Sequence, residues 1–127
     1  MATLASAGKT ASLTALRDSI DSGSGNGYME IGTTGFATIL ATLPLAKPCG
    51  SVSADTLTLN TPFSDSAADA GGSAAVARIK KSDGTAVIAS MTVGKTGDSA
   101  EVILTAASTT ITLGQPINVT AATFAYP

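Results

Sequence analysis

The 127-residue sequence contains no histidine and no tryptophan, a single cysteine and only five aromatic residues. Without histidine the chain lacks the commonest general base, catalytic-triad member and metal ligand. The lone Cys49 has no partner for an intrachain disulfide and no histidine to activate it, so we expect it to pack in the core. We interpret Asp65 and Asp69 as turn residues rather than calcium ligands. We therefore predict no catalytic residues, no metal site and no cofactor, and we expect a protein that is not an enzyme.

Charged residues are also scarce, at 13% of the chain, with seven Lys and Arg against nine Asp and Glu. The sequence has no basic stripe interleaved with aromatics, so we expect no nucleic-acid partner. No apolar run approaches the roughly 20 residues that a membrane-spanning helix needs, and we expect no membrane partner. Residues 1–10 lack a cationic start and a continuous apolar segment, which argues against a secretory signal.

Small side chains dominate instead: 23 Ala, 19 Thr, 14 Ser and 13 Gly make up 69 of the 127 residues. The length fits one compact domain, and the 44% hydrophobic content argues against intrinsic disorder. Because Ala and Thr bury little apolar area each, we expect a thin core. We therefore expect association of copies of the chain, as a dimer or a trimer, to supply part of the stability.

The N-terminal part of the sequence predicts a short helix or arm. Leu13, Leu16 and Ile20 lie at helical spacing within residues 10–22, and Gly23 follows as a stop signal. The Gly- and Ser-rich stretch that comes next is typical of a linker or mobile loop. We therefore divide the chain into an N-terminal arm or helix with its linker, residues 1–27, and a β-domain, residues 28–127, and expect the arm to move as a unit.

From residue 28 onward, short runs of Val, Ile, Thr and Leu are separated by Gly, Pro and Asp, which indicates a mostly β fold. We predict an antiparallel β-sandwich of about eight strands, and both a jelly-roll and an immunoglobulin-like strand order are compatible with the pattern. Leu57 and Leu59 alternate with polar residues and are expected to face the core. The predicted strands are residues 28–31, 36–43, 56–61, 73–81, 85–93, 100–105, 109–113 and 117–126.

The Asp-Gly pair within residues 81–85 indicates a β-hairpin. A three-residue loop, 82–84, with Gly84 in the left-handed conformation, opposes Ile79 to Val87 and collects the apolar residues on one face. A two-residue loop would instead mix charged and apolar residues on that face. We therefore predict the three-residue loop.

The predicted register sends Arg78 and Lys80 to the opposite face of the hairpin. With Lys81 they form a cationic cluster that is suited either to dock an acidic partner surface or to discourage edge-to-edge aggregation. Glu30 and Glu101 lie in other predicted strands, and we expect each on a solvated strand face rather than in a carboxylate pair.

Several stretches taken together resemble a family of small proteins of tailed bacteriophages: residues 40–44, 53–59, 64–80 and 82–87, and the ending 109–120 that leads to Phe124. They cover most of the chain after Leu40, and the sequence departs from the family near Val76, where an aromatic residue is more frequent. The resemblance implies a virion component and brings no catalytic residues. Within virions, the size and composition are most like those of a capsid decoration, or cement, protein, a class that is small, mostly β and oligomeric.

The resemblance therefore implies a non-enzymatic virion protein, made in the host cytoplasm and located on the capsid surface. Its expected partners are the major capsid protein, between whose subunits it binds, and copies of itself. The alternatives are a tail or neck component and a host-surface module that binds a carbohydrate or a receptor. We expect deletion of residues 1–22 to weaken particle binding and to leave the β-domain folded. The residues expected to contact the capsid are Leu13, Leu16, Arg17, Ile20, Arg78 and Lys80.

Overall fold

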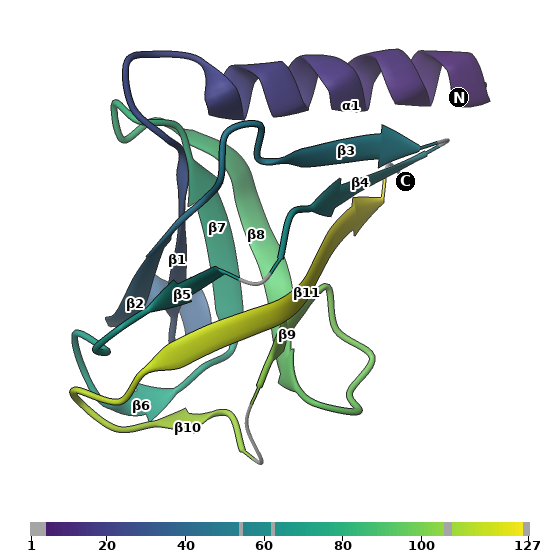
Figure 1. The fold of residues 1–127 in the computed structure, drawn as a ribbon. Helices are drawn as coiled ribbons and strands as arrows, with labels where there is room; N and C mark the ends of the chain where they lie inside the picture. Colours follow the sequence, from purple (N-terminus) through teal and green to yellow (C-terminus); the bar gives the residue numbers. More distant parts are fainter. Residues whose placement is uncertain (1–4, 54, 62, 106–107, 126–127) are drawn as a thin grey trace.

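The computed structural model describes residues 5–53, 55–61, 63–105 and 108–125 (Figure 1). The predicted fold class is confirmed, because the chain is mostly β with one helix at its N-terminal end. The described elements are α1 (Ser6–Asp21), β1 (Tyr28–Gly32), the 3-10 helix η1 (Thr34–Phe36), β2 (Ile39–Pro44), β3 (Gly50–Ser53), β4 (Thr56–Leu59), β5 (Phe63–Asp65), β6 (Gly72–Ser73), β7 (Val76–Lys80), β8 (Ala86–Lys95), β9 (Val102–Leu104), β10 (Thr110–Ile111) and β11 (Ile117–Ala125).

One large curled sheet runs in the order β2-β1-β7-β8-β9-β11-β4-β3, and β5 also pairs with β11. The curl brings β5 beside β2, where the Thr42 N–H donates to Asp65 Oδ2 at 3.1 Å and the Asp69 N–H donates to the Leu40 carbonyl at 2.7 Å. Strands β6 and β10 form a separate two-stranded ladder at the end of the molecule away from α1 (Figure 1). The two sides of the curled sheet enclose a single apolar core.

All strand pairs in the large sheet are antiparallel except β8 and β9, which run parallel. The prediction of an antiparallel sheet is therefore wrong at this pair. Parallel neighbours usually need a crossover of a dozen or more residues. Here residues 96–101 suffice, because the pair covers only three residues of each strand, from Val93 opposite Val102 to Lys95 opposite Leu104.

Several predicted strand positions need correction. The predicted strand 36–43 begins only at Ile39, because residues 34–36 form η1, in which Gly35 and Phe36 both have positive φ. Strands β3 and β5 were missed, since each is short and serine-containing and shows little apolar alternation. The strand predicted at residues 56–61 is present as β4, which ends at Leu59, and Leu57 and Leu59 are buried as predicted. The last position of the predicted strand 117–126 lies outside the described residues.

The hairpin between β7 and β8 has the predicted three-residue loop. Lys81 N–H donates to the Thr85 carbonyl at 3.0 Å, and Gly84 has φ +90°. The predicted pairing of Ile79 with Val87 is wrong, however, because Ile79 lies opposite Ile88. The register shifts again farther along the hairpin. A regular pairing from the loop onward would place Ala77 opposite Ala89, but Ala77 lies opposite Met91.

The physical reason for these shifts lies in the spacing of the apolar residues of β8. Ile88 and Met91 are three positions apart, and a regular strand would place them on opposite faces. An irregularity leaves Ala89 and Ser90 both exposed and buries Ile88 and Met91 together. Burial of the two large side chains therefore outweighs regular pairing.

Helix α1 lies across one end of the curled sheet, over β3 and β4 (Figure 1). Its two buried side chains, Leu13 and Ile20, belong to the same core cluster as the strands, with 1% and 0% of their surface exposed. The segment after the helix is held in place as well: Asn26 Nδ2 donates to the Leu45 carbonyl at 2.9 Å, and Lys47 Nζ donates to the Gly23 carbonyl at 3.1 Å. The described part of the predicted arm is thus integrated into the β-domain.

Candidate interaction surface

A cluster of charged and aromatic side chains lies on the outer face of the β1–β7 pair. The register places Glu30 opposite Arg78 and Tyr28 opposite Lys80. Arg78 Nε donates to Glu30 Oε1 at 2.7 Å, and Lys80 Nζ reaches the same oxygen at 3.0 Å. We call Glu30, Phe36, Arg78 and Lys80 the Arg78 cluster. Two of its members, Arg78 and Lys80, are predicted contact residues, and the structure brings them together around a single carboxylate.

Phe36 covers the Arg78 guanidinium from η1. The Arg78 Cζ atom lies 4.3 Å from the centroid of the Phe36 ring, within the range of a cation–π contact. Phe36 has φ +58°, a conformation that is costly for a bulky residue. Gly32 leaves room for the ring, because a Cβ atom at that position would lie 2.9 Å from Phe36 Cδ1. The backbone thus accepts local strain that holds the ring over Arg78.

The Arg78 cluster is partly shielded from water, with 14% of the Glu30 side chain, 27% of Arg78 and 20% of Lys80 exposed. Burial opposes ionisation of Glu30, but the hydrogen bonds and positive charges of Lys80 and Arg78 outweigh it and lower the pKa of that carboxyl. Glu30 is therefore ionised at neutral pH. The expectation that Glu30 lies on a solvated strand face is wrong, because its side chain is largely shielded by Arg78 and Lys80. With its carboxylate the cluster carries a net charge of about +1.

The four predicted contact residues in α1 have different environments. Leu13 and Ile20 are buried in the core of the chain, so in this conformation their side chains offer no surface to a partner. Leu16 is half-buried against the same core. Arg17 keeps 29% of its side chain exposed and pairs with its neighbour Asp18, whose side chain is 64% exposed, at 3.1 Å. Arg17 and Leu16 are thus the members of this group with surface left for contact.

A second surface feature is a row of small hydroxyl-bearing side chains on the outer face of β3, β4 and β11. Ser51 lies opposite Thr58, which lies opposite Thr123, and all three are exposed. The opposite face of these strands buries Leu57 in the core. The alternation of the strands therefore places a row of small, uncharged side chains on the outer surface.

Leu113 is the third feature, because 67% of this large apolar side chain is exposed. It lies in a turn closed by the Gln115 N–H, which donates to the Thr112 carbonyl at 2.9 Å, and by the Thr112 N–H, which donates to Gln115 Oε1 at 2.9 Å. The Gly114 N–H donates to the Ala68 carbonyl at 2.9 Å and ties the turn to the neighbouring loop. This turn was not predicted from the sequence, although Gly114, which has φ +83°, is a turn signal.

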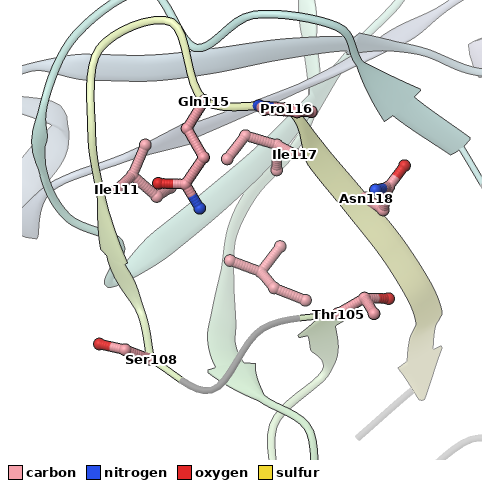
Figure 2. Close-up of a pocket in the computed structure, with 8 residues that line it drawn as sticks. Thr105, Ser108, Ile111, Gln115, Pro116, Ile117 and Asn118 are labelled. Atoms are coloured by element: carbon pink, nitrogen blue, oxygen red, sulfur yellow. The ribbon is translucent and has the colours of Figure 1, made fainter.

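A small pocket lies behind the same turn, between β9, β10 and the start of β11 (Figure 2). Ile111, Gln115 and Ile117 line it together with Ser108 and Asn118. Its free volume of about 10 Å³ has room for about one water molecule. Ligand-binding clefts usually hold several hundred Å³, so this pocket is too small for a metabolite or a sugar.

The other residues singled out in the sequence have structural partners. Asp65 Oδ1 accepts a hydrogen bond from the Ala67 N–H at 3.1 Å, which confirms its interpretation as a turn residue. Glu101 Oε1 accepts a hydrogen bond from the Thr92 N–H at 3.0 Å. Cys49 is buried as predicted. Within the described ranges, no group of three or more possible metal ligands comes together.

Comparisons with protein-family models, with curated proteins and with solved structures find no match to this chain. Among the helices of the described residues, none is long and apolar enough to cross a membrane. The candidate interaction sites are therefore the surfaces described above. Among them, the Arg78 cluster combines two ion pairs with Glu30 and the contact between Arg78 and Phe36.

Proposed function

We propose that this protein is a non-enzymatic structural component of a bacteriophage virion that decorates the capsid and stabilises it by binding between subunits of the major capsid protein. The observation that carries the proposal is the Arg78 cluster, where Arg78 is held by Glu30 on the outer face of β1 and β7 and covered by Phe36. Arginine and aromatic residues are enriched where proteins bind one another. The resemblance of residues 40–44, 53–59, 64–80, 82–87 and 109–120 to small phage proteins supports the same proposal.

The rest of the surface suits broad contacts with other copies of the chain. The row of Ser51, Thr58 and Thr123 offers hydroxyl groups and no charge, and closely packed small side chains can meet over a wide area. We propose that the protein assembles as a dimer or a trimer on the capsid surface, because repeated weak contacts at equivalent sites add up through multivalency.

Of the alternatives, the carbohydrate-binding module receives the least support. Such modules stack sugars on exposed aromatic rings. The described aromatics are instead buried, as Phe63 is, or half-buried, as Tyr28, Phe36 and Phe124 are.

The proposal is tested by adding the purified protein to capsid shells assembled from the major capsid protein of the same phage and measuring co-sedimentation. We expect saturable binding at a fixed ratio to the capsid subunits, and a shell that withstands heat better when the protein is bound. Absence of binding to intact shells would contradict the proposal. Binding confined to isolated tails or necks would favour the tail or neck alternative.

A further inference from the structure

Arg78 is held in one orientation by contacts on two sides. Its Nε is engaged by Glu30 at 2.7 Å, and the Phe36 ring lies against the plane of the guanidinium at 4.3 Å. Among the described residues, no partner bonds the terminal nitrogens Nη1 and Nη2 of Arg78. Within the described ranges, no buried side-chain nitrogen or oxygen lacks a hydrogen-bond partner, so the unbonded Nη1 and Nη2 atoms reach the surface as a preformed pair of donors.

We propose that the Nη1 and Nη2 atoms of Arg78 bind a single carboxylate on the surface of a protein partner. Two parallel N–H donors match the two oxygens of a carboxylate, and a fixed guanidinium loses little freedom on binding. Glu30 and Phe36 act as positioning residues, because they hold the guanidinium and leave its outer edge open. This proposal rests on the proposed function only in the identity of the partner, which would be the major capsid protein.

The charges around the site favour one carboxylate over a polyanion. The Arg78 cluster carries about one net positive charge, and the whole chain carries a net charge of −2. Nucleic acids and anionic membranes are bound by several cations acting together. With Glu30 inside the cluster, a run of phosphates would meet repulsion as well as attraction. A lone carboxylate flanked by neutral residues fits this arrangement best.

The chain contains its own control for this proposal. Its two arginines, Arg17 and Arg78, have nearly equal side-chain exposure, 29% and 27%. Arg17, however, donates both Nε and Nη2 to Asp18 Oδ1, at 3.3 Å and 3.1 Å, and that aspartate is 64% exposed. Arg17 therefore has one fewer terminal donor available and an exposed carboxylate as its partner. Because Arg17 and Arg78 are about equally exposed but only Arg78 is held with its terminal nitrogens free, any difference in carboxylate binding reports on how the side chain is held.

The test is a nuclear magnetic resonance titration of the full chain with a capped Ala-Ala-Glu-Ala-Ala peptide, following the Nε–Hε signals of the two arginines and, in every variant, the backbone amide signals of β1 and β7. We expect the Arg78 signal to shift and saturate while the Arg17 signal stays in place. Arg78→Lys keeps the charge and the ion pair with Glu30 but loses the fork, so we expect binding to weaken by about tenfold. Arg17→Lys is the matched control and is expected to leave the affinity unchanged.

A second variant tests the positioning role of Phe36. Phe36→Leu keeps an apolar cover but removes the aromatic face, and we expect a several-fold weaker affinity together with broadening of the Arg78 Nε–Hε signal. The thermal midpoint of each variant shows that it is folded. Equal shifts of both arginine signals, no saturation, or unchanged affinity in Arg78→Lys would each overturn the proposal. None of these outcomes involves a virion component, so they are distinguishable from a failure of the proposed function.

Discussion

Replacement of the two buried residues of α1 tests whether the helix is part of the folded domain or a separable arm. Leu13 and Ile20 have 1% and 0% of their surface exposed and belong to the core cluster. Truncation of a buried Leu or Ile to Ala costs about 2–5 kcal/mol, because it removes apolar contacts and leaves a cavity. Leu13→Ala and Ile20→Ala should therefore each lower the free energy of unfolding by at least about 2 kcal/mol.

The double variant is the stronger test, because its expected loss is comparable to the total free energy of unfolding of a domain. Native domains unfold with about 5–15 kcal/mol. Leu13→Ala combined with Ile20→Ala should remove about 4–10 kcal/mol and leave the whole chain, strands included, largely unfolded. On the same grounds, we now expect deletion of residues 1–22 to destabilise the β-domain, contrary to the expectation from the sequence.

The assay is urea denaturation followed by circular dichroism, with the signals of helix and strand read separately. Ala15→Ser, on the exposed side of α1, is the matched control and should change the unfolding free energy by less than about 0.5 kcal/mol. If the double variant lost the helical signal while the strand signal kept its midpoint, the helix would be a detachable arm and the reasoning would be refuted.

Three further predictions concern the charge cluster, the hairpin and the cysteine. The pKa of Glu30 lies below its ordinary value of 4.5, so the stabilisation from ionised Glu30 is present above pH 4.5 and lost as the pH falls through the lowered pKa; acid titration of stability should be shallower in Glu30→Gln. Gly84 has φ +90°, and Gly84→Ala should cost about 1–2 kcal/mol in thermal unfolding, whereas an unchanged midpoint would contradict the left-handed loop. Burial, followed by the negative charge of Asp21, raises the pKa of Cys49 to about 12. Iodoacetamide should therefore label Cys49 only after the protein is unfolded in guanidinium chloride, and rapid labelling of the native chain would be inconsistent with the structure.

Two local patterns in the sequence predicted the local structure correctly. The alternation around Leu57 and Leu59 identified a half-buried strand, and the Asp-Gly pair at 83–84 identified the hairpin loop. The pairing predicted beyond the loop, Ile79 with Val87, is wrong, because regular alternation does not continue through β8. The three-residue spacing of Ile88 and Met91 was the available signal, since only an irregular strand can bury both.

The candidate surface was predictable only in part. Arg78 and Lys80 were singled out from the hairpin register, and the structure places them on one face as expected. Their partner Glu30 is 48 positions away from Arg78, and it comes near only because β1 pairs with β7. The position of Phe36 depends on a positive φ within η1, which no residue preference indicates for phenylalanine. Contacts that depend on strand order and on strained backbone are set by the tertiary fold.

The sequence predicted helix α1 but not the surface on which it packs. Leu13, Leu16 and Ile20 have the spacing of an amphipathic helix, and α1 forms where they lie. Amphipathic spacing does not distinguish a helix that docks on another protein from one that packs on its own domain, since both bury one face. Gly27 allows α1 to pack on its own domain, because a Cβ atom at position 27 would lie 2.7 Å from Ile20 Cγ2.

The most direct test of the proposed function is the copy number of this chain in purified virions, measured by quantitative mass spectrometry against the major capsid protein. A protein that decorates the capsid occupies equivalent sites over the whole shell. The account therefore predicts a copy number within a few-fold of that of the major capsid protein. A handful of copies would place the chain in the tail or neck, and its absence from the virion would contradict the account.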